Sequence, residues 1–395
     1  MPNLQRVVVK NYRSLEEIEL YSRGVNVLFG PNGSGKTTFL DAIWFVRDCA
    51  IRGVDEAASQ RSHGIGVLWD RAEQNSHISI EIETERAIYS IEFGFSSGRI
   101  EAFVGERLRS KYNDKLIFER IIGSDKAKFF HSGLSKFVTV ELREPERLAL
   151  SRYLDSDSDL SEAKEIHLLL KYTRKYNARS ADIHRLRTYG SEFVSHQRLY
   201  DRCQNLWSVL RNLRDRQDWG KTEYETIMQF MRKSFPSFNR LALEAQGTNS
   251  VYGNFIEKDH EEPIKASGVS DGHLQLLIHL TALFSEGTRT NLILLDEPEV
   301  SLHPHALAVL AEAVEEAVST WNKQVFIATH SPVLMSQFET EDIIASEVGD
   351  RGQTTLKRVS EIFGIRDLLS EYAVGSLYMS ELIAPQSKLE TVADV

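Results

Sequence analysis

Hydrophobic and polar residues change their spacing several times along this chain, and each change predicts a different kind of structure. Near the beginning, short apolar runs at residues 6–10, 18–20 and 25–29 predict three strands. Residues 38–46 then have the apolar spacing of a helix, and a polar stretch follows. We interpret residues 1–75 as the first half of an α/β unit.

Alternating apolar and polar residues dominate the next part of the chain. The alternation runs over residues 78–103 and continues at residues 116–122 and 137–140. This period of two is typical of an antiparallel sheet that has one face exposed to water. The pattern therefore predicts an antiparallel β lobe at residues 76–141, inserted after the first helix.

Helical spacing replaces this alternation further along the chain. Leu206, Leu210 and Leu213 lie three or four positions apart, as expected for a buried helix face. A proline ends the helical pattern shortly before residue 240. We therefore assign residues 142–240 to an inserted helical subdomain and residues 241–395 to the second half of the α/β unit.

The overall composition is that of an ordinary globular protein, with 42% hydrophobic and 26% charged residues. Its 395 residues have room for two or three domains, and one large α/β unit with insertions is equally compatible. No apolar run approaches the ~20 residues that span a bilayer, and the N-terminus lacks a signal-peptide pattern. Because only Cys49 and Cys203 occur, without metal-ligand spacing, we expect a reduced, cytoplasmic setting.

Charge is distributed unevenly along the chain, whose net charge is −10. Residues 164–240 contain 16 Lys or Arg and 8 Asp or Glu, so this segment is +8 and the rest of the chain −18. Basic charge interleaved with aromatic residues suits contact with DNA or RNA, and the aromatic residues here include Tyr172, Tyr176, Tyr189 and Tyr200. A solvated helix face has the same composition, so both interpretations stay open.

A glycine-rich motif at residues 30–38 (Gly-Pro-Asn-Gly-Ser-Gly-Lys-Thr-Thr) follows the third predicted strand and opens the first helix. Strand, glycine loop and helix in this order are typical of a P-loop, whose backbone amides surround phosphate. Lys36 would reach the β- and γ-phosphates of ATP and assist catalysis, and Thr37 would hold Mg²⁺. The predicted nucleotide-binding residues of the loop are Asn32, Gly33, Ser34, Gly35, Lys36, Thr37 and Thr38. The alternative is an ordinary glycine turn, which rarely matches the motif this fully by chance.

A second motif supplies two carboxylates. Residues 291–298 (Asn-Leu-Ile-Leu-Leu-Asp-Glu-Pro) read as a buried parallel strand that ends in acids. P-loop enzymes place an Asp beside Mg²⁺ in this way, so Asp296 would hold the ion. Glu297 would polarise the attacking water as the catalytic base. A strand that merely ends in a polar turn is the alternative, and the presence of Lys36 weakens it.

Two further segments contribute candidate residues. Residues 267–273 open an apolar helix and bring Ser270 and Gly272 to its N-terminus, although a good N-cap alone would look the same. Residues 324–332 form another apolar strand that ends at His330. A neutral imidazole there could contact the γ-phosphate or water, or it could be structural.

Taken together, these motifs resemble ABC-type ATPases of the RecF/SMC/OLD group, and more narrowly the standalone bacterial ATPases related to the OLD ATPase domain. The resemblance rests on residues 11–15 (Asn-Tyr-Arg-Ser-Leu), the P-loop, the signature motif at 269–272, the Walker B motif at 292–299, the D-loop at 301–304, the switch histidine at 329–330 and residues 375–378. The signature motif departs from the usual pattern because Val269 replaces Leu and Asp271 replaces the Gly of transporters.

The resemblance implies an α/β fold, namely a P-loop ABC-type ATPase head with a mixed central sheet. It also implies that two heads close face to face, with each ATP held between one P-loop and the partner's signature motif. Ser270 and Gly272 would then bind the nucleotide of the second subunit, in a homodimer or a higher even-numbered homo-oligomer. No Q-loop glutamine is identifiable, and Gln60 and Gln74 in the polar stretch are weak candidates.

Similar proteins act in anti-phage defence, in systems such as Septu or PARIS. The leading hypothesis is therefore an ATP-dependent switch that senses nucleic acid or a phage factor and controls an effector. The OLD family proper adds a Toprim nuclease after its ATPase. Since 65 residues follow His330, we expect no such domain in this chain and a nuclease on a separate partner.

Two other functions fit the same motifs less well. A RecF/SMC-like DNA repair ATPase would act on DNA without a toxic effector. A transporter ATPase subunit would energise a membrane permease, but Asp271, residues 11–15 and the missing Q-loop argue against it.

Overall fold

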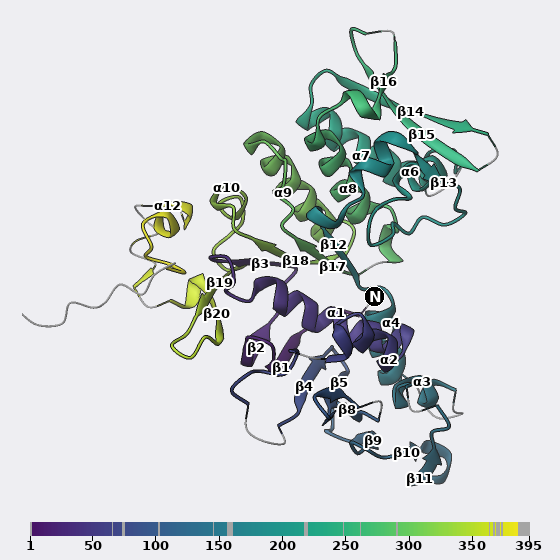
Figure 1. Cartoon of the computed structure of the whole chain (residues 1–395), viewed down its shortest axis with the longest axis vertical. Coiled ribbons are helices and arrows are strands. Elements are labelled where there is room, and N and C mark those ends of the chain that lie inside the picture. The colour runs from purple at the N-terminus through teal and green to yellow at the C-terminus, as the bar shows by residue number, and fades with distance from the viewer. Residues whose placement is uncertain are drawn as a thin grey trace, which may run out of the picture.

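The computed structural model describes residues 2–385 (Figure 1), apart from residues 65, 73–75, 102, 145, 156–160, 217–219, 248, 261, 290, 363, 366–367, 369–371 and 373. Gln74, one of the two Q-loop candidates, lies outside the described residues. Two large sheets and the helices around them make up most of the described structure.

A six-stranded mixed sheet forms the centre of the molecule. In spatial order its strands are β12 (Arg174–Asn177), β17 (Leu292–Asp296), β18 (Gln324–Thr329), β3 (Val25–Phe29), β19 (Ile343–Val348) and β20 (Thr354–Arg358). The first five are parallel, and β20 runs antiparallel to β19. The predicted mixed central sheet is thus confirmed.

The apolar runs of this sheet are continuous because both of its faces are buried. In β17, Ile293 and Leu295 point into one hydrophobic core, and Leu292 and Leu294 point into the other. One core lies on one face of the mixed sheet, and the second lies between its other face and an antiparallel sheet.

The antiparallel sheet has eight strands. In spatial order they are β11 (Lys136–Glu141), β10 (Lys126–His131), β9 (Leu116–Arg120), β8 (Gly105–Ser110), β5 (Ala87–Phe93), β4 (Ile78–Glu83), β1 (Arg6–Tyr12) and β2 (Leu15–Tyr21). The sequence predicts this sheet only from residue 76 onward. The structure shows that it begins at the N-terminus, since β1 pairs with β4 with Val8 opposite Glu81.

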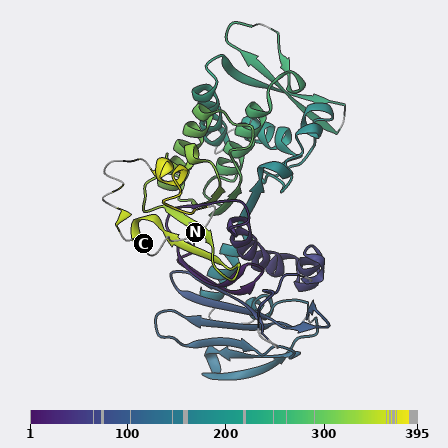
Figure 2. The ribbon, with the colours of Figure 1, turned by 60° about the vertical axis from the view of Figure 1, so that its left-hand side comes forward.

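The P-loop helix α1 (Lys36–Arg52) lies between the two sheets (Figure 2). Its Phe39 ring is 6.1 Å from Phe326 of the mixed sheet. One and a half turns further on, its Phe45 ring stacks 4.7 Å from Phe93 of the antiparallel sheet. The helix is therefore apolar on two sides, which explains why most of its residues are buried.

Helices α8 (Asp271–Phe284), α9 (Pro304–Ser319), α6 (Leu206–Asp215) and α7 (Gly220–Ser234) cover the other face of the mixed sheet. A hairpin of β14 (Phe238–Gln246) and β15 (Ser250–Glu257) adjoins them, with β13 (Ser191–Glu192) and β16 (Ile264–Lys265) on β15.

Residues 142–240 are mainly helical, as their spacing predicts, but they do not pack as one unit. Helices α3 (Ala149–Leu154) and α4 (Ser161–Lys171) join the core beside α1, and α6 and α7 join the opposite core. Strand β12, which lies between these helix pairs in the chain, is the edge of the mixed sheet. The domain boundaries themselves stay a prediction.

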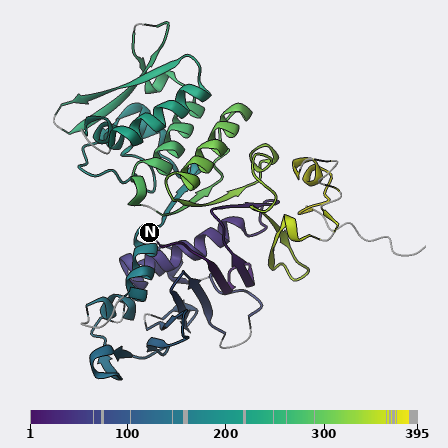
Figure 3. The same cartoon turned by 180° about the vertical axis from the view of Figure 1, so that it is seen from behind.

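Within the described part of the chain, the other α-helices are short: α2 (Val54–Ser59), α5 (Ile183–Thr188), α10 (Pro332–Met335) and α12 (Val374–Met379). Helix α12 packs beside α10, well away from the antiparallel sheet (Figure 3). None of the helices in the described part of the chain is both long and apolar enough to cross a bilayer.

Candidate functional site

The P-loop connects β3 to α1 and packs against strands β19 and β20 of the mixed sheet. Gly35 has a φ of 97°, and a Cβ atom at this position would lie 2.0 Å from the Thr354 Oγ1 atom. Any other residue would therefore be strained and would collide with β20. Ser346 of β19 donates a hydrogen bond of 2.8 Å to the Ser34 carbonyl, and Ser14 hydrogen-bonds Thr354 at 2.8 Å. The loop thus rests on β19, β20 and the turn after β1.

The loop has room and free hydrogen-bonding groups for a phosphate chain. A Cβ atom at Gly33 would meet nothing within 4 Å. The buried Ser34 hydroxyl has no hydrogen-bond partner among the described residues. The Lys36 ammonium donates to the Gly30 and Pro31 carbonyls, both at 2.8 Å. Burial lowers the pKa of Lys36, and the carboxylates of Glu297, Glu299 and Asp296 oppose that shift. Phosphate oxygens would accept hydrogen bonds from the Ser34 hydroxyl and from the Lys36 ammonium, so the loop fits a nucleotide.

Asp296 is the last residue of β17 and both of its carboxylate oxygens accept hydrogen bonds. Thr37 Oγ1 donates to one oxygen at 2.8 Å, and Asn177 Nδ2 donates to the other at 2.9 Å. Thr37 and Asp296 together offer the hard oxygen ligands that Mg²⁺ prefers. Among the described residues, no group of three or more His, Cys, Asp or Glu residues could hold a metal ion.

Asn177 was not predicted from the sequence. It ends β12, in register with Asp296 of the neighbouring strand β17. The four-residue strand Arg-Lys-Tyr-Asn has no apolar run, and its place at the edge of the sheet follows only from long-range pairing. A local pattern therefore gave no indication of this contact.

Glu297 adopts a left-handed backbone conformation with a φ of 52°, which is uncommon for residues other than glycine. Its amide donates to the Ala328 carbonyl at 2.8 Å, which fixes the turn beside β18. One carboxylate oxygen of Glu297, Oε2, pairs with Arg179. The other, Oε1, is 4.0 Å from the His330 Nδ1 atom. The same His330 atom is 3.3 Å from Glu299. The structure thus brings Glu297 and His330 together, and it adds Arg179.

The signature residues lie at the start of α8. Ser270 is exposed, and its hydroxyl hydrogen-bonds the His273 ring at 2.9 Å. A Cβ atom at Gly272 would lie 2.8 Å from the Ser301 carbonyl of the D-loop, so this glycine permits a close approach of two backbones. Within the described part of the chain, no hydrogen bond joins Ser270 or Gly272 to the P-loop.

A cavity of about 420 Å³ opens beside this cluster, along α1. It is lined by Arg13, Thr37, Asp41, Trp44, Gln60, Arg61, Lys175, Asn177, Ser180, Asp201, Arg202 and Asp296. Gln60, one of the two Q-loop candidates, lines this cavity together with Thr37 and Asp296, and the Q-loop residue stays undecided.

Asp41 is the centre of an ionic cluster in that wall. Tyr12 donates to it at 2.6 Å, Arg61 pairs with it at 2.8 Å, and Lys175 lies 3.8 Å away. Burial would raise the pKa of Asp41, but Arg61 and Lys175 outweigh burial and lower it. Arg13 lies 3.6 Å from the same carboxylate. It is thus part of the wall of the candidate site.

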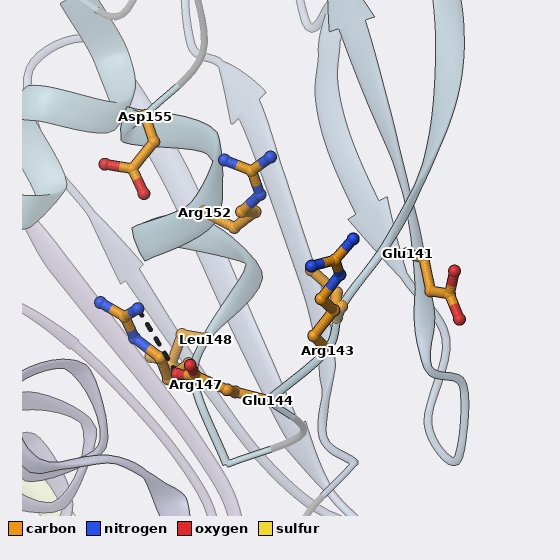
Figure 4. A pocket seen from close by; sticks show the side chains of 8 residues that line it. Glu141, Arg143, Glu144, Arg147, Leu148, Arg152 and Asp155 are labelled. Atoms are coloured by element: carbon orange, nitrogen blue, oxygen red, sulfur yellow. Dashed lines mark ion pairs between the residues drawn. The ribbon is translucent and has the colours of Figure 1, made fainter.

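A second cavity, of about 520 Å³, lies between β11 and α3 (Figure 4). Acidic and basic side chains alternate around it, and Arg147 pairs with Glu144 at 3.5 Å. None of the predicted site residues lines it. The clustered motifs therefore place the candidate site at the P-loop and not at this cavity.

The basic segment at residues 164–240 is less available to nucleic acid than its composition suggests. Many of its cations pair with nearby acids: Arg174 with Glu286, Arg185 with Glu192, Arg187 with Asp271, Arg202 with Asp182, and Lys233 with Glu312. Tyr176 is buried, so it cannot stack on a base, whereas Tyr189 is 62% exposed. Nucleic-acid contact through this segment stays a prediction.

Comparisons with known proteins agree with this architecture. The OLD nuclease of Thermus scotoductus is 24% identical over 395 residues, which cover 95% of this chain and 68% of that protein. Endonuclease GajA of Bacillus cereus is 22% identical over 360 residues, which cover 86% of this chain and 57% of GajA. A crystal structure of an Smc head bound to the C-winged helix domain of ScpA has a TM-score of 0.51 at 14% identity. It covers 90% of this chain and 97% of the Smc chain, and it shows that the fold is that of an SMC head.

A family model matches residues 25–336, which include the P-loop, the signature motif, Walker B and His330. The resemblance to the OLD and SMC ATPases that the motifs indicate is thereby confirmed. The chain belongs to the family described as "AAA domain, putative AbiEii toxin, Type IV TA system".

Proposed function

We propose that this protein is an ATP-hydrolysing switch, two copies of which close around ATP and control a partner effector. The observation that carries this proposal is the convergence of three motifs, the P-loop, Walker B and the switch histidine, at the carboxyl ends of neighbouring strands of the mixed sheet. Lys36, Asp296 and Glu297 come from segments more than 250 residues apart, yet Thr37 contacts Asp296 directly and the charge of Glu297 acts on Lys36. His330 completes the cluster beside Glu297.

Each residue has a chemical role in this proposal. The amides of the P-loop and the Ser34 hydroxyl bind the phosphates, and Lys36 adds a positive charge. Thr37 and Asp296 hold Mg²⁺, which neutralises phosphate charge when it is bound. Glu297 orients the attacking water and accepts its proton, and His330 contacts the terminal phosphate or that water. The products are ADP and phosphate.

The nucleotide site would be completed by a second subunit. Ser267, Gly268, Ser270 and Asp271 are all exposed at the start of α8, so this end of the helix is accessible to another copy. Its backbone amides and the Ser270 hydroxyl can donate to an anion. The SMC-head fold supports a head-to-head homodimer, or an even-numbered assembly built from such dimers.

The effector we propose is a nuclease carried by a separate polypeptide, and the process is anti-phage defence. In support, two relatives are named OLD nuclease and endonuclease GajA, and a part of each lies outside the match with this chain. The trigger would be nucleic acid or a phage factor, sensed directly or through the partner.

ATP turnover and dimerisation test this function. Glu297→Gln should lower turnover by about 100-fold or more, because a general base is lost, while ATP stays bound and the closed dimer accumulates. Lys36→Ala should abolish ATP binding. Matched controls are Glu339→Gln and Lys357→Ala, which change exposed residues away from the site.

Unchanged turnover in Glu297→Gln would exclude Glu297 as the base, and wild-type ATP affinity in Lys36→Ala would exclude the P-loop assignment. Mass spectrometry of proteins that co-purify with the Glu297→Gln variant in ATP should identify the effector. ATP turnover that DNA stimulates in the isolated protein, with no partner found, would instead favour a DNA repair ATPase.

A further inference from the structure

Arg179 contacts the candidate catalytic base, and no sequence motif of the site includes it. Its guanidinium Nε donates to the Oε2 atom of Glu297. It belongs to the 3₁₀ turn η3 (Ala178–Ser180), which directly follows β12. This turn lies beside the Walker B acids, although 117 residues of chain separate Arg179 from Asp296.

Two side chains hold the turn in place. The Asn177 side chain accepts a hydrogen bond from the Arg179 amide at 2.9 Å and donates to Asp296 at 2.9 Å. From the other side, the buried Gln275 side chain of α8 donates to the Ala178 carbonyl at 2.9 Å. The backbone at Arg179 is thus held to Walker B through Asn177 and to the signature helix α8 through Gln275.

The tip of Arg179, in contrast, is free to change partners. Its side chain is 63% exposed, whereas that of Glu297 is 22% exposed. An ion pair that water reaches on one side is weak, and a phosphate group with more than one negative charge competes well for it. The planar guanidinium also matches the oxygens of a phosphate group better than an ammonium does.

The contact occupies one of the two oxygens through which Glu297 could act as a base. Arg179 covers the Oε2 atom, and His330 lies 4.0 Å from Oε1. A general base must hydrogen-bond the water whose proton it removes, so one of its oxygens has to be available. In the observed arrangement the side chains of Arg179 and His330 flank the carboxylate.

We propose that Arg179 is a γ-phosphate sensor that leaves Glu297 for the terminal phosphate of ATP. This inference rests on the proposed ATPase function and adds a residue and a control step to it. ADP has no γ-phosphate, so with ADP bound Arg179 stays on Glu297. The Oε2 atom of Glu297 is then released only when a triphosphate is bound, and the signature helix adjusts the exchange through Gln275.

A double-mutant cycle between positions 179 and 297 tests the exchange. Affinities for the non-hydrolysable ATP analogue AMP-PNP and for ADP are measured in the wild type, Arg179→Ala, Glu297→Gln and the double variant. Arg179→Ala should weaken AMP-PNP binding roughly tenfold, the usual size of one charge-assisted contact, and leave ADP binding within about twofold. Glu297→Gln should tighten AMP-PNP binding severalfold, because Arg179 loses its competing partner, and should do so only when Arg179 is present.

Two further variants serve as controls. Arg179→Lys keeps the charge without the planar group, so its AMP-PNP affinity should be intermediate. Arg185→Ala removes a cation of the same segment that pairs with Glu192, and both affinities should stay unchanged. Because Arg179 is largely exposed, its replacement should leave the melting temperature unaltered.

Equal weakening of both nucleotides by Arg179→Ala would overturn the sensor role, and so would an effect of Glu297→Gln that is the same in both backgrounds. Failure of the wild type to bind either nucleotide would overturn the ATPase function itself. The two failures are therefore distinguishable.

Discussion

Asp296 shows how much of the site depends on a single carboxylate. One of its oxygens accepts from Thr37 and the other from Asn177, so its orientation is fixed from two sides. The first contact joins two motifs that the sequence predicts. The second comes from the edge strand β12, and Asn177 would orient Asp296 in the role of metal ligand that we propose for it.

Replacing Asn177 should therefore weaken the metal site. In Asn177→Ala the Asp296 carboxylate loses a donor, and we expect the Mg²⁺ concentration for half-maximal ATP turnover to rise about 10-fold or more. A Mg²⁺ titration of turnover measures this. The variant Asn212→Ala removes a side chain that bonds only backbone carbonyls elsewhere, and its Mg²⁺ titration should match the wild type. A wild-type titration in Asn177→Ala would contradict the orienting role.

The lowered pKa of Lys323, a residue remote from the candidate nucleotide site, predicts that the free energy of unfolding depends on pH. Burial lowers its pKa to about 7; Glu286 and Glu223 oppose this shift, while Arg174 and Arg289 add to it. Between about pH 7 and the unfolded value of about 10.4, the unfolded chain binds the proton and the folded chain does not. The free energy of unfolding should therefore rise with pH in this window.

Urea denaturation at pH 7, 8 and 9 measures that slope, and Lys323→Met should reduce it. Lys357→Met changes an exposed lysine and should keep the wild-type slope. Identical slopes in the wild type and in Lys323→Met would show that Lys323 keeps its proton in the folded protein.

At the residue scale, the sequence offers site candidates where a short pattern contains them. Lys36 and Thr37 follow a glycine loop, and Asp296 and Glu297 follow an apolar strand, so short patterns contain them. Arg179 lies in no such pattern, because its role arises from the pairing of β12 with β17. The sequence had no means of showing which strand lies at that edge.

At the scale of elements, the contact of α8 with the D-loop gives Gly272 a structural reason to be glycine. The Cβ atom of an alanine would lie 2.8 Å from the Ser301 carbonyl, which is backbone and cannot easily move. We expect Gly272→Ala to lower the free energy of unfolding by about 1–3 kcal/mol, as overpacking does. Chemical denaturation of the isolated protein measures this.

Gly268→Ala is the matched control, because its added Cβ would meet only the Ile264 side chain, at 3.2 Å. Its loss of stability should be smaller. If Gly272→Ala is as stable as the wild type but fails to dimerise in ATP, the glycine serves the partner's nucleotide and not the packing of its own chain.

Also at the scale of elements, the pairing of β1 with β4 could not be predicted from the sequence. Periodicity correctly predicted alternating strands from residue 76 onward and buried strands in the centre. It did not predict that β1 would pair with β4, because 65 residues separate the two strands and a strand pattern carries no information about its neighbour. The antiparallel sheet therefore begins earlier than residue 76.

For the whole molecule, the composite site predicts complementation between two inactive variants. Lys36→Ala loses its own P-loop, and Ser270→Arg places a bulky cation where the partner's ATP would bind. A mixed dimer has one intact site, made from the P-loop of the Ser270→Arg subunit and the signature motif of the Lys36→Ala subunit. The mixture should therefore recover part of the wild-type turnover, and each variant alone should remain inactive.

Turnover of the mixture at several ratios measures this recovery, which should be greatest near equal amounts. A mixture that is no more active than its components would contradict a site shared between subunits. Full activity of Ser270→Arg alone would show that the signature motif does not contact ATP.

Helix α1 also has a mechanical consequence, since one end of it follows the P-loop and its sides contact both sheets. The antiparallel sheet continues for four strands beyond β5, to β11, which is roughly 19 Å at the usual strand spacing. A rotation of α1 by about 10° would thus move β11 by ~3 Å if the sheet turns as a rigid plate. A sheet that turned in this way would act as a lever arm, because it would enlarge a small rotation at the P-loop into a greater displacement at its far edge.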